Sequence, residues 1–145
     1  MKDILGYEGK EVVVVGAATG MGDAAARTLV ELGAEVHALD VAEITAPVKQ
    51  SIEIDLRDKA SIDAAIEKLP ARVDSLFHCA GLPGPPFSAL DTMLVNFVGQ
   101  HHFTEALVPR IADGGAIAII TSVAGIGWAK NRESVDALVA TPDFD

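Results

Sequence analysis

A run of four valines followed by a glycine-rich turn constrains this chain more than any other feature of its sequence. The valines are residues 12–15, and the turn after them is Gly16-Ala17-Ala18-Thr19-Gly20-Met21-Gly22. A β-branched segment that is apolar on both faces is typical of a strand inside a parallel sheet. Apolar residues then recur at helical spacing until Gly33, which is a residue type that often follows the end of a helix. The region therefore predicts a buried strand, a tight turn and a helix in direct succession.

Short apolar strands and helical segments alternate along the rest of the chain. Further strands are expected at residues 35–39, 52–54, 73–79 and 116–120, the last of which is apolar on both faces and predicted to be buried. Helices are expected before Pro70 and at residues 91–108, while three prolines exclude regular structure from residues 82–86. This alternation predicts right-handed βαβ units. The fold class is therefore α/β, a Rossmann-type doubly wound parallel sheet of five strands in the order 3-2-1-4-5, in which residues 1–145 form one domain.

The composition excludes several classes of protein. Hydrophobic residues make up 50% of the 145 residues, which excludes disorder, and no apolar run is long enough to span a membrane. The start of the chain has no apolar signal core, so we expect a cytoplasmic protein. A net charge of −10 disfavours nucleic acid as a partner. A single cysteine, Cys79, and the adjacent His101 and His102, which face different sides of a helix, predict no metal site.

The strand, the glycine turn and the helix together suit a pyrophosphate. The start of a helix offers unpaired N–H groups and partial positive charge, and glycines let phosphate oxygens approach the backbone. Asp40 ends the second predicted strand, eighteen residues after Gly22. A carboxylate there can accept hydrogen bonds from both hydroxyls of an adenine ribose and would repel a 2′-phosphate, so we expect NAD rather than NADP. The alternatives are a turn that serves packing alone and a solvated carboxylate at a strand end.

Five motifs, in order along the chain, resemble the short-chain dehydrogenase/reductase family. They are Gly16-x-x-x-Gly20-x-Gly22, Asp55-Leu56, His78-Cys79-Ala80-Gly81, Asn96 in the long predicted helix, and Ser122 after the fifth strand. The chain departs from the family pattern at Val15, where a threonine is usual, and at His78 and Cys79, which replace two asparagines. Within the family, the chain is most similar to the 3-alpha-hydroxysteroid dehydrogenase/carbonyl reductase subgroup.

The resemblance implies a role for particular residues. The residues expected to bind the cofactor are Gly16, Ala18, Thr19, Gly20, Met21, Gly22, Asp40, Asp55, Leu56, Cys79, Ala80 and Gly81. Ser122 is expected to hold the substrate oxygen and Asn96 to fix a water in a proton relay. Three alternatives stay open: Ser122 as a capping hydroxyl, Asn96 as a partner for neighbouring backbone, and Cys79 as a redox-sensitive thiol instead of a small side chain that lines the cofactor.

The activity that the resemblance implies is hydride transfer between NAD and a secondary alcohol or ketone, with a steroid-like substrate and a homo-oligomer, either a dimer or a tetramer. The family's acid/base pair, Tyr-x-x-x-Lys, does not occur in the sequence: the only tyrosine is Tyr7, and Val135 stands thirteen residues after Ser122. We therefore expect these residues to be the front part of a longer enzyme, because residues 116–120 would otherwise leave an uncovered apolar sheet edge. The alternative is a non-catalytic dinucleotide-binding sensor or scaffold.

Overall fold

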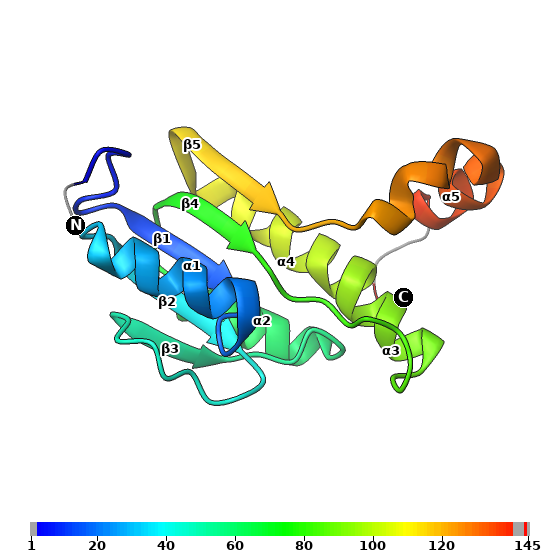
Figure 1. Cartoon of the computed structure of the whole chain (residues 1–145), viewed down its shortest axis with the longest axis horizontal. Helices are drawn as coiled ribbons and strands as arrows, with labels where there is room; N and C mark the ends of the chain where they lie inside the picture. The colour runs from blue at the N-terminus through cyan, green and yellow to red at the C-terminus, as the bar shows by residue number, and fades with distance from the viewer. Residues whose placement is uncertain (1–2, 141–143, 145) are drawn as a thin grey trace.

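The computed structural model describes residues 3–140 and residue 144, and its centre is a parallel sheet of five strands (Figure 1). The strand order is β3-β2-β1-β4-β5, so the predicted fold class and strand order are confirmed. The strands are β1 (Glu11–Val15), β2 (Glu35–Asp40), β3 (Gln50–Glu53), β4 (Val73–His78) and β5 (Ile111–Ile119). The main helices are α1 (Gly20–Glu31), α2 (Lys59–Glu67), α3 (Ala89–Met93), α4 (Gly99–Leu107) and α5 (Arg132–Val139).

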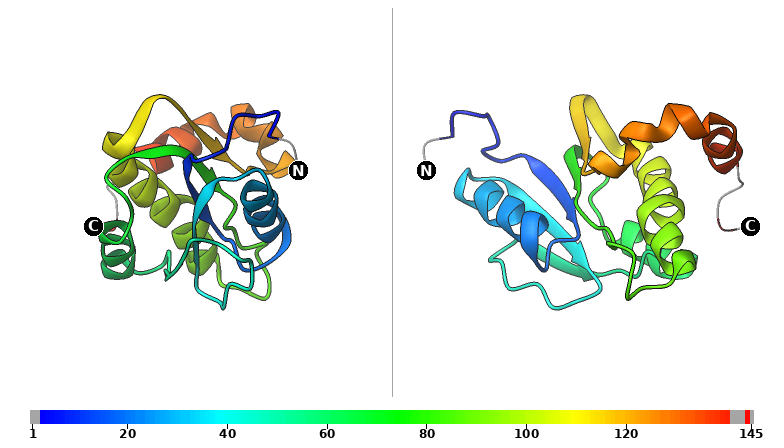
Figure 2. Two further views of the ribbon diagram at one scale, coloured as in Figure 1. Left: turned by 90° about the vertical axis from the view of Figure 1, so that its left-hand side faces the viewer. Right: turned by 45° about the vertical axis from the view of Figure 1, so that its right-hand side comes forward.

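Helices cover both faces of the sheet around β1, which explains the run of valines. Val13 and Val15 belong to a core with residues of α2 and α4, whereas Val12 and Val14 belong to a second core with residues of α1. All four valines are fully buried. Figure 2 shows the sheet between α1 on one side and α4 on the other. Alternate side chains of a strand point to opposite faces, so a strand covered on both faces must be apolar at every position.

The long helix predicted at residues 91–108 is a composite of different helical types. It begins earlier than predicted, at Ala89, because the Ser88 side chain accepts a hydrogen bond from the Asp91 backbone N–H and caps the first turn. A π-helical turn, Leu94–Val98, separates α3 from α4, and a 3-10 turn, Val108–Arg110, follows α4. The extra residue of a π-turn leaves little trace in hydrophobic periodicity, so the sequence pattern showed one continuous helix.

β5 differs from its prediction in both extent and burial. It begins at Ile111 instead of residue 116, since a register irregularity lets Val73 pair with Ile111 before regular pairing resumes at Ala116. The expectation that residues 116–120 are buried is wrong: Ile117 and Ile119 are 39% and 40% exposed. β5 is the sheet edge, and the chain beyond it, a 3-10 segment (Val123–Asn131) and α5, stands away from the sheet (Figures 1 and 2). None of the described helices is long and apolar enough to cross a membrane.

Candidate functional site

A cavity of about 330 Å³ is lined by residues at and after the carboxyl ends of the strands. Figure 1 shows that α1 begins at this end of the sheet. Its walls come from the loops after β1, β2, β3 and β4 and from the helical segment after Ser88. The lining residues are Val15, Gly16, Thr19, Asp40, Val41, Ile54, Asp55, Leu56, Arg57, Cys79, Ala80, Gly81, Leu82, Phe87 and Val95. Ligands of open α/β sheets bind at this end, in the crevice beside the first strand, where the order of the strands reverses between β1 and β4.

The glycine turn brings the start of α1 against the end of β1. A Cβ on Gly22 would lie 1.9 Å from the Gly16 carbonyl oxygen, so only glycine permits this approach of the helix to the turn. Thr19, which precedes α1 and lines the cavity, makes no side-chain hydrogen bond to the first turn. The starts of α2 and α3, in contrast, are capped by the side chains of Asp58 and Ser88. Of α1, α2 and α3, therefore, only α1 begins with backbone N–H groups that no side chain caps.

Asp40 joins the end of β2 to the glycine turn. Its Oδ2 accepts a hydrogen bond of 2.8 Å from the Ala18 backbone N–H, and its Oδ1 accepts one of 2.9 Å from the Ala42 backbone N–H. The carboxylate therefore holds the turn in place and lines the cavity at the same time. Each oxygen keeps a second lone pair for a further donor.

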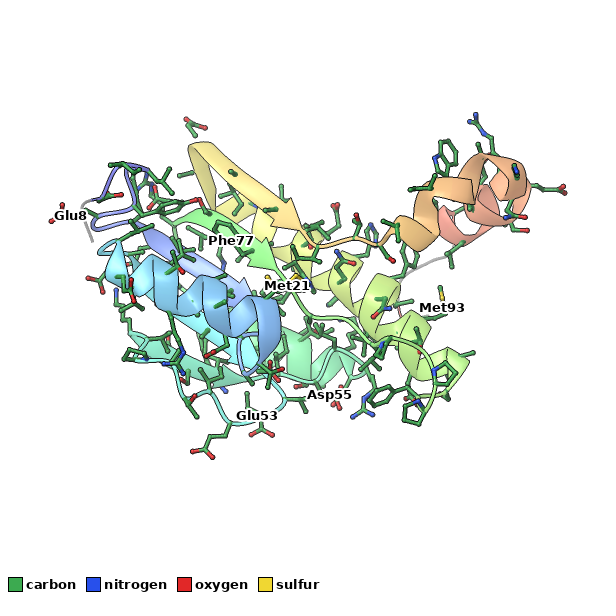
Figure 3. All side chains as sticks on the ribbon, viewed as in Figure 1. Glu8, Met21, Glu53, Asp55, Phe77 and Met93 are labelled. Atoms are coloured by element: carbon green, nitrogen blue, oxygen red, sulfur yellow. The ribbon has the colours of Figure 1, made fainter. Side chains whose placement is uncertain are left out.

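Asp55 and Leu56 line the cavity beside Asp40, just after β3, where the Ile54 backbone N–H donates to the Asp40 carbonyl at 3.1 Å (Figure 3 labels Asp55). The Arg57 guanidinium donates to both carboxylate oxygens of Asp55, with Nη2 2.7 Å from Oδ2 and Nε 2.9 Å from Oδ1. These hydrogen bonds with Arg57 lower the pKa of the Asp55 carboxyl and outweigh the opposing effect of its partial burial. Asp55 is therefore an ionised hydrogen-bond acceptor at neutral pH.

The end of β4 supplies the third wall, through Cys79, Ala80 and Gly81. Burial raises the pKa of the Cys79 thiol. A raised pKa disfavours the reactive thiolate, so Cys79 fits a packing role better than a redox role. His78, just before it, is 1% exposed, and burial lowers the pKa of its imidazole to about 4. His78 is not among the residues that line the cavity, and its ring packs edge-on against Phe103 at a centroid distance of 6.1 Å.

Asn96 lies in the π-helical turn and uses its side-chain amide to hold the loop after β4. Its Oδ1 accepts from the Leu82 backbone N–H at 2.7 Å, and its Nδ2 donates to the Leu82 carbonyl at 2.9 Å. This contact is the backbone-satisfying role that the sequence left open for Asn96. Through it, Asn96 positions Leu82, which lines the cavity although Asn96 does not.

Ser122 is exposed in the segment between β5 and the following 3-10 helix, and it does not line the cavity. Its carbonyl accepts a hydrogen bond from the Gly125 N–H at 3.0 Å. Eight of the predicted cofactor residues, in contrast, line the cavity together: Gly16, Thr19, Asp40, Asp55, Leu56, Cys79, Ala80 and Gly81. Ala18, Gly20, Met21 and Gly22 shape or flank the turn without lining the cavity.

Sequence reasoning did not identify the other lining residues, which are Val15, Val41, Ile54, Arg57, Leu82, Phe87 and Val95. Val41 could have been found as the neighbour of Asp40, but nothing in the sequence distinguishes Arg57 or Phe87 from other loop residues. The two adjacent histidines have separate partners: the His101 ring stacks on Phe97, and His102 Nε2 lies 2.7 Å from Asp63 Oδ1. Within the described part of the chain, no three side chains of metal-ligating type form a cluster.

Comparison with known proteins places this geometry in a family. The sequence profile described as short chain dehydrogenase matches residues 10–132. Coniferyl-alcohol dehydrogenase from a Pseudomonas strain is 36% identical over 119 residues, which cover 82% of this chain and 46% of that protein. The 3-alpha-hydroxysteroid dehydrogenase/carbonyl reductase of Comamonas testosteroni is 30% identical over 124 residues, which cover 83% of this chain and 47% of that protein. The chain thus spans about half the length of the curated relatives that it matches.

The fold also matches solved structures. A short chain dehydrogenase of Shigella flexneri, solved in complex with NADP, superposes with a TM-score of 0.75 over 95% of this chain and 71% of that one, at 22% sequence identity. The family profile spans the glycine turn, the Asp55 loop, Asn96 and Ser122. The chain belongs to the short-chain dehydrogenase/reductase family of oxidoreductases, whose cofactors are NAD or NADP.

Proposed function

We propose that this chain is the cofactor-binding part of an NAD-dependent oxidoreductase that transfers hydride between nicotinamide and a secondary alcohol or ketone. The observation that supports the proposal most strongly is that Thr19, at the uncapped start of α1, lines the same cavity as the Asp40 and Asp55 carboxylates. These groups suit the three parts of an adenine dinucleotide: its pyrophosphate, its adenine ribose and its base. We keep a cytoplasmic location and a homo-oligomer as predictions from the sequence.

The choice of NAD over NADP rests on Asp40. A 2′-phosphate on the adenine ribose would meet a carboxylate that Ala18 and Ala42 already hold in place. Among the described residues that line the cavity, Arg57 is the single lysine or arginine, and its guanidinium donates to Asp55. The Shigella flexneri structure, solved with NADP, shows that the fold accommodates the phosphorylated cofactor, so Asp40 is the residue to test.

The chain's own residues would bind and orient the cofactor, which supplies the hydride acceptor when bound. In this proposal the start of α1 takes the pyrophosphate, while Asn96 holds the loop at Leu82. Ser122 would orient the substrate oxygen, as the family resemblance implies. The acid/base Tyr-x-x-x-Lys of the family is not in the 145-residue sequence, so we propose that it is supplied outside these residues. The substrate class follows the relatives, of which one acts on coniferyl alcohol and one is named for 3-alpha-hydroxysteroids; a steroid-like substrate is our finer proposal.

A second candidate function is a dinucleotide-binding sensor or scaffold without chemistry. The observation that favours it is again the sequence itself, in which Tyr7 is the only tyrosine and precedes β1. Both candidates require dinucleotide binding. They differ in whether a purified protein that contains these residues oxidises a secondary alcohol with NAD.

Calorimetric titration of the 145-residue chain with NADH and NADPH tests the shared requirement. We expect NADH to bind at least about tenfold more tightly than NADPH. The Asp40 carboxylate would accept a charge-assisted hydrogen bond from the adenine ribose of NADH, whereas it would repel the 2′-phosphate of NADPH. Asp40→Ala should weaken NADH binding and reduce that preference to about threefold or less. Asp23→Ala serves as a matched control, because Asp23 lies in the first turn of α1 but pairs with Arg27 and does not line the cavity. Failure of both dinucleotides to bind would overturn the proposal, and an unchanged preference in Asp40→Ala would remove Asp40 from it.

A further inference from the structure

A second cavity, the amino-end cavity, has a volume of about 220 Å³ and lies at the amino ends of β1, β4 and β5. Its walls come from the N-terminal segment before β1 (Figure 1), from the start of β4 and from the first part of β5. The side chains with polar groups in its lining are those of Tyr7, Lys10, Arg72, Asp74, Ser75 and Asp113. Because the strands are parallel, this cavity is at the opposite end of the sheet from the one that Asp40 lines, and the two linings share no described residue.

Asp74 holds two cations at the amino-end cavity. Its side chain is 10% exposed, and its Oδ1 lies 3.4 Å from Lys10 Nζ and 3.0 Å from Arg72 Nη2. Its Oδ2 accepts a hydrogen bond of 3.1 Å from the Glu11 backbone N–H, which fixes the carboxylate on the sheet. Burial would raise the pKa of Asp74, but the hydrogen bonds from the Glu11 N–H and Lys10, together with the charge of Arg72, outweigh it and lower the pKa. The carboxylate is therefore ionised at neutral pH.

The two cations keep donors for a ligand. A guanidinium has five N–H groups and an ammonium group has three, and the side chains of Arg72 and Lys10 are 66% and 46% exposed. Asp74 carries one negative charge against their two positive charges, so a positive charge is left in excess beside it. A carboxylate that enters the cavity would meet donors that Asp74 already holds in place, which reduces the entropy cost of ordering two long side chains.

β5 brings a charge of the opposite sign to the same cavity. The pairing of β4 with β5 passes from Val73–Ile111 directly to Ser75–Ala116, so residues 112–115 bulge opposite Asp74 alone. The bulge packs tightly on β4, since a Cβ on Gly115 would lie 2.8 Å from the Asp74 carbonyl oxygen. The bulge also places Asp113 in the lining, and within the described part of the chain no hydrogen bond or ion pair occupies its carboxylate.

We propose that the amino-end cavity binds a small zwitterion, an amino acid with a short aliphatic frame, whose carboxylate contacts Lys10 and Arg72 and whose ammonium group contacts Asp113. The volume of about 220 Å³ suits such a ligand, because drug-sized molecules occupy pockets of roughly 300 Å³ or more. A simple anion would be repelled by Asp113, and a simple cation would be repelled by the excess positive charge beside Asp74. The site is independent of the proposed function, because no residue of the other cavity takes part in it.

The test is a nuclear magnetic resonance titration of the nitrogen-15-labelled 145-residue chain at pH 7 and constant ionic strength. The probes are glycine, β-alanine and 4-aminobutyrate, three zwitterions with increasing separation of the charges, and acetate and methylammonium, which carry one charge each. We expect at least one zwitterion to bind about three- to tenfold more tightly than acetate, which is the range of one ammonium–carboxylate contact at a partly exposed site. The shifts should centre on the backbone amides of Ser75, Gly114 and Gly115.

Three variants assign the two ends of the ligand. Asp113→Ala should lower the preference over acetate to about twofold or less, because it removes the partner of the ammonium group and the repulsion of acetate together. Arg72→Gln should weaken the binding of the zwitterion and of acetate alike. Arg132→Gln is a matched control, since Arg132 is 70% exposed and paired with Asp136 on α5, outside the lining. It should leave both affinities unchanged, and circular dichroism checks that each variant is folded.

Four results would overturn the inference. The first is that no zwitterion binds in the millimolar range. The second is that acetate or methylammonium binds as tightly as the best zwitterion, which would mean that the cavity recognises a single charge. The third is an Asp113→Ala variant that keeps the full preference. The fourth is a set of shifts centred on Gly16 and Gly81, which would place the ligand in the other cavity. None of these results bears on the titration with NADH and NADPH, which tests the proposed function separately.

Discussion

His78 is a buried imidazole whose charge the fold opposes. It is 1% exposed, and neither ring nitrogen has a hydrogen-bond partner among the described residues. Burial lowers the pKa of the folded imidazole from 6.5 to about 4. Between these two pH values the unfolded chain binds a proton that the folded chain does not, so the free energy of unfolding rises with pH.

We therefore expect stability to be highest above about pH 6.5 and to fall as the pH drops toward 4, by up to about 3 kcal/mol from His78 alone. His78→Leu should remove this loss and also stabilise the protein at pH 7, because two unpaired polar atoms leave the core. Urea unfolding at pH 7 and pH 5 measures both effects. The prediction fails if the variant and the unsubstituted chain lose equal stability between these pH values.

Gly22 and Gly20 allow a paired test of the glycine turn. A Cβ on Gly22 would clash with the Gly16 backbone, whereas a Cβ on Gly20 would have nothing within 4 Å and only the strain of its φ of +60°. We expect Gly20→Ala to cost about 1–2 kcal/mol of stability. Gly22→Ala should cost about 3 kcal/mol or more, since backbone must move. Thermal unfolding of the two variants checks the order, and a Gly22→Ala variant as stable as Gly20→Ala would contradict it.

The contact between the π-helical turn and the loop after β4 depends on one side chain, Asn96. Its two hydrogen bonds to the Leu82 backbone join helix and loop. Asn96→Ala should lower stability by about 1–2 kcal/mol and remove the protection of the Leu82 amide from hydrogen exchange. Asn96→Asp should keep that protection, because a carboxylate oxygen can still accept from the Leu82 N–H. Equal exchange of this amide in the Ala variant and the unsubstituted chain would show that the contact does not hold the loop.

The sequence predicted those elements that leave a clear apolar pattern or a clear stop. The valines of β1, the helix expected before Pro70 and the helix end before Gly33 all correspond to observed features. The start of α3 at Ala89 was missed, although Ser88 followed three residues later by Asp91 is a capping pattern that could have predicted it. The π-turn and the irregular register of β5 could not be predicted, because neither changes the apolar pattern that the prediction uses.

The same distinction holds for the candidate site. Residues that backbone geometry imposes, such as Gly16 of the turn and Asp40 at a strand end, were predicted and line one cavity. Arg57 and Phe87 were missed because a loop places them, and loop geometry has no period in the sequence. Ser122 stays a prediction: it is exposed in the segment after β5 and does not line the cavity.

The sheet as a unit ends in an edge that no described element covers. Ile117, Ile119 and Ile120 are 39%, 40% and 47% exposed, and β5 pairs with β4 alone. An apolar edge of this kind is a template for pairing with another chain. The net charge of −10 opposes such pairing by repulsion, but salt screens that repulsion. We therefore expect the 145-residue chain to associate more strongly as ionic strength rises.

Sedimentation velocity of the 145-residue chain at about 0.02 M and 0.5 M salt measures this association, since the Debye length falls well below 10 Å over that range. Ile119→Glu should abolish it by placing a charge on the edge. Val139→Glu is a matched control, because it adds the same charge to α5 at a position that is 65% exposed and away from the sheet. If both variants reduce association equally, net charge is responsible and not the edge. If the unsubstituted chain stays monomeric at high salt, the acidic surface is not what protects the edge, and the apolar strand tolerates solvent without pairing.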